Sequence, residues 1–241
     1  MDYLHVVSSG SHGNCYLLSV DGDVLIIDCG VPIKIIKSSL GWDISHVSGA
    51  ICCHKHKDHS LSINELSKMG IKVFSPYMKN SITSKYVLGD YSVTGFPIRS
   101  KEGRWLHTNP DGTECPVFGF LIEKSGFVMV YMSDFMYCPY TFKRKKPNVM
   151  LIECNHCDGL LSSDEQKYSH SVLGHASLEV TKGIVEANRT DSLANVILCH
   201  LSEDWSDEKR MVEEVQNVAG NNASVCAASQ NTTYILNTPH I

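Results

Sequence analysis

The chain has 241 residues, of which 43% are hydrophobic and 20% are charged, so it can bury a substantial core and is expected to form one domain over residues 1–241. The formal net charge of -5 argues against a generally basic coat for nucleic acid, although a local basic cluster is compatible with it. No apolar run approaches the roughly 18 residues of a membrane span, and no signal-peptide pattern precedes the ten cysteines. We therefore expect a cytoplasmic protein with reduced thiols and no membrane partner.

Short apolar strands separated by turns are predicted for the first 53 residues. A strand over residues 4–7 is followed by turn chemistry over residues 8–14. Strands over residues 16–20 and 24–28, separated by a short turn, predict a hairpin. An amphipathic helix over residues 33–40 precedes the apolar run 48–53, which is typical of a buried strand.

The densest group of polar residues directly follows that run and reads His54-Lys55-His56-Lys57-Asp58-His59. Imidazoles and carboxylates are the ligands that a borderline-soft divalent metal prefers. In an irregular loop, His54 and His56 can bind one ion while Asp58 and His59 turn toward a second, which is the geometry of a two-metal hydrolase. A solvated loop is the alternative, but such side chains rarely cluster this densely at a strand end without a site to serve.

The pattern His-x-His-x-Asp-His resembles the signature of the metallo-β-lactamase superfamily at every specified position. Most members are metal-dependent hydrolases. The resemblance and the repeated strands that end in polar residues predict an α/β fold, a four-layer αββα sandwich of two mixed sheets flanked by helices. An aspartate at the end of strand 24–28 commonly supports the metal loop in this superfamily, so Asp28 is expected to orient a ligand. Capping of the following turn is the alternative for Asp28.

The rest of the chain is expected to supply the remaining ligands. A helix is predicted over residues 62–69 and a strand over residues 71–75, whereas residues 76–104 are too weakly patterned to place elements. The resemblance implies a third histidine for the first ion, and His107 is the candidate, with a surface histidine as the alternative. Asp134 follows the apolar strand 127–132 and can bridge two cations. His200 follows the apolar strand 195–199 and completes the second site.

The expected metal ligands are His54, His56 and His107 for one ion and Asp58, His59 and His200 for the other, with Asp134 shared. Four segments, residues 9–14, 25–30, 152–156 and 174–177, resemble the YycJ/WalJ-type branch of the superfamily, whose members are regarded as nucleases, including DNA exonucleases. The chain departs from the family pattern at Cys53, where a threonine is common, and at His12, where a serine is common. Its segment 107–120 is also longer than expected and borders the site.

Glu153 and His175 resemble the glutamate and histidine of the tRNA 3′-processing ribonucleases in the same superfamily. His175 follows a glycine at the head of a helix predicted over residues 177–187, and Glu153 ends a strand predicted over residues 148–152. A hydrogen-bonded carboxylate raises the pKa of an imidazole, so we expect Glu153 to orient His175 as the acid that protonates the leaving oxygen. Helix capping by His175 is the alternative, and His156 and His170 are weaker candidates for the acid. The expected catalytic residues are Asp58, Asp134, Glu153 and His175.

Two other segments have a second interpretation. The basic residues 143–146 either hold phosphates or form a solvated turn. Residues 154–157 contain two cysteines and a histidine but lack a second ligand pair at zinc-finger spacing, which disfavours a separate structural metal. A last helix is predicted over residues 207–218.

These features predict a hydrolase with two divalent ions, zinc or manganese, that cleaves phosphodiester bonds, most specifically a DNA exonuclease-like nuclease. The expected partner is a nucleic acid, DNA more than RNA, or a small phosphodiester, and a homodimer is left open. One alternative is a hydrolase of a small substrate, such as a cyclic nucleotide phosphodiesterase, a thioesterase or a lactamase-like enzyme. A metal-bearing binding protein without turnover is the other.

Overall fold

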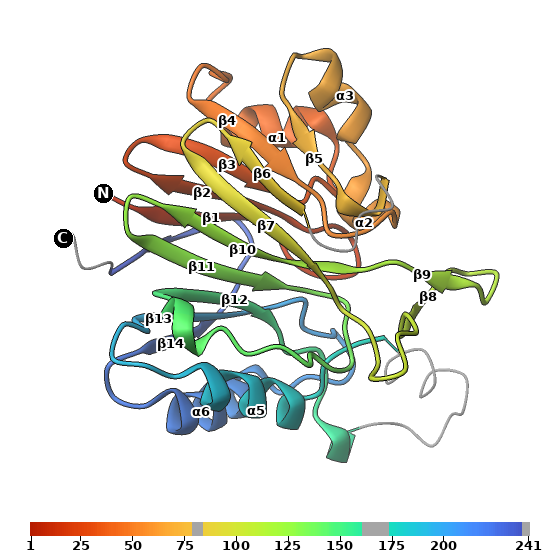
Figure 1. Ribbon diagram of the computed structural model, residues 1–241, viewed down its shortest axis with the longest axis vertical. Coiled ribbons are helices and arrows are strands. Elements are labelled where there is room, and N and C mark those ends of the chain that lie inside the picture. The colour runs from red at the N-terminus through yellow and green to blue at the C-terminus, as the bar shows by residue number, and fades with distance from the viewer. Residues whose placement is uncertain (79–83, 161–173, 238–241) are drawn as a thin grey trace.

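Two mixed β-sheets pack face to face, and helices cover both outer faces (Figure 1). This computed structural model describes residues 1–78, 84–160 and 174–237. The arrangement is the four-layer αββα sandwich that the sequence predicts. Among the described residues, no helix is both long enough and apolar enough to cross a membrane.

The first sheet has six strands and carries the amino-terminal half of the chain. In spatial order its strands are β15 (Thr232–Ile235), β1 (Tyr3–Ser8), β2 (Cys15–Val20), β3 (Asp23–Ile27), β4 (Val47–Ile51) and β5 (Val73–Phe74). The pairs from β15 to β3 are antiparallel, whereas β3, β4 and β5 are parallel. Helices α1 (Ile33–Ser39) and α3 (Ile63–Lys68) cover its outer face through Ile36 and Leu66.

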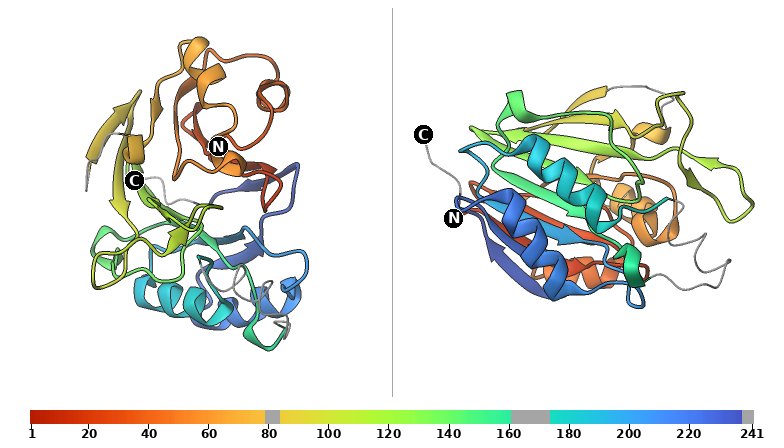
Figure 2. Two further views of the ribbon diagram at one scale, coloured as in Figure 1. Left: turned by 90° about the vertical axis from the view of Figure 1, so that its right-hand side faces the viewer. Right: turned by 90° about the horizontal axis from the view of Figure 1, so that it is seen from below.

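The second sheet has seven strands. In spatial order they are β14 (Ser224–Ala227), β13 (Asn195–Cys199), β12 (Val149–Glu153), β11 (Phe127–Met132), β10 (Phe118–Lys124), β7 (Tyr91–Pro97) and β6 (Ser84–Leu88). Strands β11 to β14 are parallel, and the remaining pairs are antiparallel. Helices α5 (Leu178–Asn188) and α6 (Glu208–Ala219) lie across its outer face (Figure 2).

Alternation along the strands produces separate cores on the two faces of each sheet. In β11, Phe127, Met129 and Tyr131 pack between the sheets. Val130 and Met132, which point the opposite way, pack against the layer that contains α5 and α6. A one-residue register slip in β11 would exchange the side chains of the two cores and disrupt the packing of both. Full burial of one such side chain contributes about 1.5–3 kcal/mol, so this register is strongly preferred.

The segment over residues 76–104, where the sequence pattern is weak, contains the short helix η1 (Pro76–Met78) and strands β6 and β7. Strand β7 does alternate in burial, but Gly95 and Pro97 lie within it, and both residues are unusual in a strand. Gly95 is needed there because a Cβ would lie 2.7 Å from Cγ of Pro76.

The carboxyl ends of β3 and β4 and those of β11, β12 and β13 lie at one edge of the sandwich, on the right in Figure 1. The short helix α2 (Lys57–Ser60) and the small hairpin of β8 (His107–Thr108) and β9 (Glu114–Cys115) lie at the same edge (Figure 1). Parallel strands present the residues that follow them at a common edge. The polar residues expected to bind metal therefore come from several elements that end in one place.

Candidate metal centre

Three polar residues at this edge have left-handed backbone conformations. Asp28 and His200 directly follow β3 and β13, and Asp134 follows β11 by two residues. Their φ angles are 54°, 53° and 55°. Residues other than glycine rarely adopt this conformation, and those that do cluster at functional sites. The surrounding structure therefore holds the backbone of these three residues in a strained conformation at the edge of the sheets.

The first ligand group contains His54, His56 and His107, whose ring nitrogens lie within 4.8 Å of one another. His54 and His56 come from the loop after β4, and His107 begins β8. Nδ1 of His56 lies 2.9 Å from Nε2 of His107. The structure thus brings together the three histidines expected for one ion, although His107 is more than 50 residues from the other two in sequence.

The second ligand group contains Asp58, His59, Asp134 and His200. Nε2 of His59 lies 2.8 Å from Oδ2 of Asp134 and 3.2 Å from Oδ2 of Asp58. The same Oδ2 of Asp134 is 3.2 Å from Nε2 of His54, which belongs to the first group. Asp134 therefore lies between the two groups, as a shared ligand requires.

Glu153 and His175 adjoin the second group. Oε1 of Glu153 accepts hydrogen bonds of 2.7 Å from Nδ1 of His175 and from Nδ1 of His200. Its other oxygen accepts from the backbone N–H groups of Phe135 and Ala176, so the buried carboxylate is held on both sides. Nδ1 of His175 is also 3.2 Å from Oδ1 of Asp134.

The electrostatics of the cluster favour a bound cation. Burial lowers the pKa of His54 well below its usual value and that of His107 to about 4, so both are neutral and able to donate a lone pair. Burial also opposes protonation of His175 and His200, but Glu153 and Asp134 raise their pKa to about 10 and about 9. The carboxylates thus keep neighbouring imidazoles protonated and positively charged. A divalent ion can take the place of such a proton, which is then released.

Buried ring nitrogens that make no hydrogen bond indicate where such ions fit. Nε2 of His54 and Nε2 of His200 are buried, and neither makes a hydrogen bond within the part of the chain that the structure describes. Their carboxylate neighbours are Asp134, at 3.2 Å from His54, and Asp58, at 3.9 Å from His200. Buried polar atoms without a hydrogen bond are rare, and an ion is one of the few explanations for them. Imidazoles and carboxylates are donors that divalent metal ions bind.

Asp28 contacts the ligand His59 on the ring nitrogen that faces away from the ligand group. Its Oδ2 lies 2.7 Å from Nδ1 of His59 and accepts a hydrogen bond from the hydroxyl of Tyr131, and its Oδ1 accepts from the backbone N–H of Cys53. The Sγ of Cys53 contacts Nδ1 of His54 at 3.1 Å. A carboxylate on the second ring nitrogen fixes the tautomer of a ligating histidine. Tyr131 belongs to the other sheet, so this bond joins the two sheets behind the ligands.

The turn over residues 8–14 also packs against the ligands. Nδ2 of Asn14 lies 3.0 Å from Nε2 of His59, and the backbone N–H of Asn14 donates to the carbonyl of Asp58. Gly30 permits this packing, because a Cβ there would lie 1.6 Å from the Asp58 carbonyl oxygen. Tyr131 and Asn14 were not identified from the sequence. Tyr131 has no signal beyond its place in a strand, whereas Asn14 lies in a segment that carries the family resemblance.

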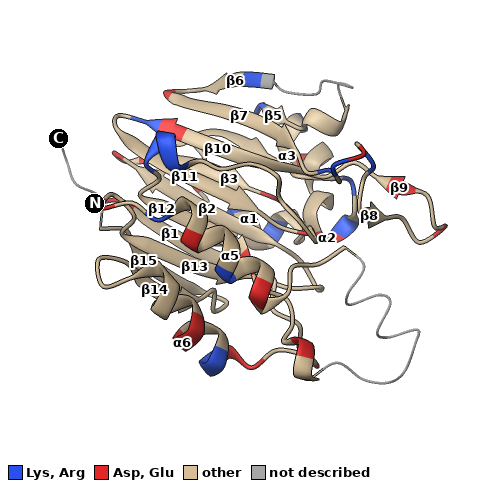
Figure 3. Cartoon of the chain, turned by 60° about the horizontal axis from the view of Figure 1, so that its bottom comes forward, with Lys and Arg blue, Asp and Glu red and all other residues tan. Residues whose placement is uncertain are grey.

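The other candidate residues that the structure describes are not members of the ligand groups. His170 and the rest of residues 161–173 are outside the described residues. Nε2 of His156 is 3.5 Å from Asp158, and none of the ligand groups among the described residues includes residues 154–157. The basic residues 143–146 form η2 (Lys143–Lys145) and its end, before the amino end of β12 and thus across the sheet from the ligands (Figure 3).

Comparisons with known proteins agree with this architecture. The family model of the metallo-β-lactamase superfamily matches residues 9–73, which include the motif at residues 54–59. The metallo-β-lactamase fold protein YhfI from Bacillus subtilis has 15% sequence identity and a TM-score of 0.68, with 97% of this chain and 98% of that chain covered. A comparison with curated protein sequences found no significant match.

Two further solved structures have the same fold. Human tRNase Z, short form, has 11% identity and a TM-score of 0.61, with 97% of this chain and 99% of that chain covered. Unliganded yeast PDE1 has 11% identity and a TM-score of 0.63, with 96% and 98% covered. The chain therefore has the metallo-β-lactamase fold, and the family match supports a place in that superfamily.

Proposed function

We propose that the chain is a single-domain, metal-dependent hydrolase that cleaves phosphodiester bonds with two divalent ions, zinc or manganese. The proposed ligands are His54, His56 and His107 for one ion and Asp58, His59 and His200 for the other, with Asp134 shared. The observation that carries the proposal is the position of Asp134, whose Oδ2 lies 3.2 Å from Nε2 of His54 and 2.8 Å from Nε2 of His59. One carboxylate between two ligand groups would be shared by two cations.

Bound ions would supply Lewis-acid activation of water and of the phosphodiester. The protein's own groups supply the rest. Asp58, a member of the second ligand group, remains partly exposed, so its carboxylate can also orient an attacking water. Asp134 would compensate the charge of both ions. His175, held by Glu153, donates a proton to the leaving oxygen, because an alkoxide is a poor leaving group.

The pair of Glu153 and His175 favours a phosphodiester over other substrates of the fold. A protonated imidazole beside the ligands suits departure of an alkoxide, and two solved structures with the fold are named as a tRNase and a PDE. The segments that resemble the YycJ/WalJ-type branch support a cytoplasmic nuclease acting on DNA more than RNA, with an exonuclease-like activity. All ten cysteines, each within the described residues, are free, which agrees with a reducing compartment.

Metal analysis and a substrate panel test the proposal. Full-length protein purified without chelator should contain two equivalents of zinc or manganese per chain. With either metal, it should hydrolyse bis-p-nitrophenyl phosphate and at least one of single-stranded DNA, double-stranded DNA and RNA. Absence of a bound transition metal, together with no turnover on addition of zinc or manganese, would overturn it.

The same panel separates the rival functions. Turnover of cyclic nucleotides, a thioester or a lactam without turnover of polymers would indicate a small-substrate hydrolase. A nuclease should bind DNA with an affinity that falls steeply as salt rises, because counterions are released from the phosphates. Tight metal binding with no turnover of any substrate would indicate a binding protein.

A further inference from the structure

We propose that Asn109 is a positioning residue that fixes the tautomer and ring orientation of His56 as a metal ligand. Asn109 lies in the turn between β8 and β9, and its Oδ1 is 3.2 Å from Nε2 of His56. The inference rests on the proposed metal centre. It assigns a role to a residue that the sequence pattern indicates only as part of a turn.

The hydrogen bonds of the turn determine which atom of Asn109 faces the imidazole. Nδ2 of Asn109 donates to Oγ1 of Thr113 at 2.8 Å and to the carbonyl of Glu114 at 3.1 Å. The Thr113 hydroxyl donates in turn to Oδ1 of Asp111 at 2.6 Å, so its oxygen accepts from Asn109. Both N–H groups of the amide are therefore used within the turn, and the carbonyl oxygen Oδ1 is the atom that faces His56.

An acceptor at this position determines which ring nitrogen of His56 carries the proton. A hydrogen bond to Oδ1 of Asn109 requires a proton on Nε2, which leaves the lone pair on Nδ1. Nδ1 is the nitrogen directed at the ligand group, 2.9 Å from Nε2 of His107. The turn thus selects the tautomer that can bind an ion together with His54 and His107.

Three of the other four ligating histidines have corresponding partners, whereas Nδ1 of His107 makes no hydrogen bond among the described residues. Nδ1 of His59 contacts Asp28, Nδ1 of His54 contacts Cys53, and Nδ1 of His200 contacts Glu153. For His56, the contact on the nitrogen that faces away from the ligand group is Asn109. His56 is only partly buried, so packing restrains its ring less than it restrains those of His54 and His59. Its orientation therefore depends more on this hydrogen bond.

Zinc titration of full-length variants tests the role. Asn109→Ala removes the acceptor and should weaken one of the two zinc sites about 10- to 100-fold, measured by competition with a chromophoric chelator, while the other site changes little. Asn109→Asp retains an oxygen acceptor for His56 but places its second oxygen against the carbonyl of Glu114, so its zinc affinity should lie between those of Asn109→Ala and the wild type. Long-range nitrogen-proton NMR of the metal-free wild type should show neutral His56 protonated on Nε2, and Asn109→Ala should show a mixture of the two neutral tautomers.

Two further variants separate positioning from stability of the turn. Thr113→Val removes the hydroxyl that holds Nδ2 but leaves Oδ1 in place, so zinc affinity should fall less than in Asn109→Ala. Asn221→Ala, in an exposed turn, should match the wild type. Unchanged zinc affinity in Asn109→Ala would overturn the inference, as would an equal loss in Thr113→Val. A wild-type protein that binds neither zinc nor manganese and turns over no substrate with either would instead overturn the proposed function, so the two failures are distinguishable.

Discussion

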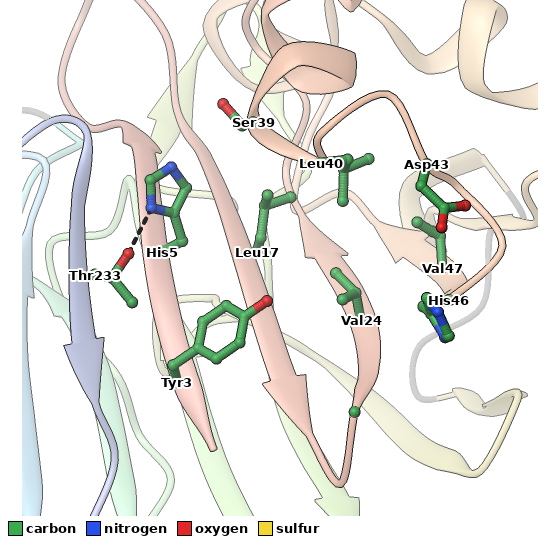
Figure 4. Close-up of a pocket in the computed structure, with 11 residues that line it drawn as sticks. Tyr3, His5, Leu17, Val24, Ser39, Leu40, Asp43, His46, Val47 and Thr233 are labelled. Atoms are coloured by element: carbon green, nitrogen blue, oxygen red, sulfur yellow. Dashed lines mark hydrogen bonds between the residues drawn. The ribbon is translucent and has the colours of Figure 1, made fainter. Parts of the chain in front are cut away.

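Two regions of the first sheet gather histidines and aspartates with very different consequences. The candidate metal centre lies at the carboxyl ends of β3 and β4. A groove of about 480 Å³ lies on the outer face, toward the amino ends of the same strands, where Val24 and Val47 line it (Figure 4). His5, Asp43 and His46 also line this groove. Both regions therefore contain the residue types of a metal site, at opposite ends of the same strands.

The polar groups of the groove either bond to neighbouring residues or are exposed. Nδ1 of His5 bonds to Oγ1 of Thr233 at 2.9 Å, and Oδ1 of Asp43 accepts from the backbone N–H of Ser45 (Figure 4 shows the first pair). Asp43 and His46 are exposed. None of the ligand groups within the described residues includes these side chains. Burial and convergence of donor atoms, rather than residue type, therefore distinguish the candidate site.

The largest expected effect comes from exchanging one aspartate in each region for asparagine. Asp134→Asn retains shape and tolerance of a left-handed backbone but removes the charge shared by the two ligand groups. We expect kcat/KM on bis-p-nitrophenyl phosphate to fall about 10³-fold, or about 4 kcal/mol, with loss of bound metal. Asp43→Asn should retain wild-type turnover and metal content. Equal effects of the two changes would remove the distinction between the regions.

Replacement of His175 should have an effect that depends on the leaving group. His175→Ala removes the proposed acid and should slow cleavage of nucleic acid about 10²- to 10⁴-fold. Most of the turnover of a p-nitrophenyl phosphodiester should remain, because nitrophenolate leaves without a proton. The measurement is the ratio of the two rates in the wild type and the variant. The same loss on both substrates would mean that His175 binds or positions the substrate instead.

Loss of a tyrosine hydroxyl should destabilise the protein at the candidate metal centre but not at the groove. Tyr131→Phe removes the hydrogen bond to the buried carboxylate of Asp28 and should lower the free energy of unfolding by about 1–3 kcal/mol. Tyr3→Phe, in the half-exposed wall of the groove, should change it by less than about 0.5 kcal/mol. Denaturant titration of both variants measures the difference. A Tyr131→Phe protein as stable as the wild type would show that Asp28 does not need this partner.

The fold was predictable where strands are buried and uninterrupted. The predicted bounds of β11 and β13 match the structure, because both strands are continuous apolar runs flanked by polar residues. Strands β6 and β7 were not placed, because Gly95 and Pro97 interrupt the pattern and β6 is an edge strand. Local sequence does not reveal that Gly95 serves a close approach to Pro76.

The candidate site was predictable to the extent that its residues carry a local signal. The motif at residues 54–59 is contiguous, and Asp134 and His200 follow recognisable strands. His107 and Glu153 were inferred with the help of a family resemblance. Tyr131, Asn14 and Asn109 act through hydrogen bonds across distant elements, and a tyrosine in a strand or an asparagine in a turn has many ordinary roles. Only the three-dimensional structure brings these residues to the ligands.

The smallest expected effect concerns basic residues at opposite edges of the sandwich. Lys143 and Arg144 precede β12, whose five residues span about 16 Å at about 3.3 Å per residue, and this exceeds the Debye length of about 8 Å at physiological salt. Lys143→Gln with Arg144→Gln should therefore leave the KM for DNA unchanged. Lys55 and Lys57 are exposed between the ligands of the motif, and Lys55→Gln with Lys57→Gln should raise KM severalfold. The salt dependence of DNA binding should also decrease, by up to about one unit in the slope for each phosphate that a lysine no longer neutralises. If the first pair weakens DNA binding as much as the second, the DNA path extends across the sheet to η2.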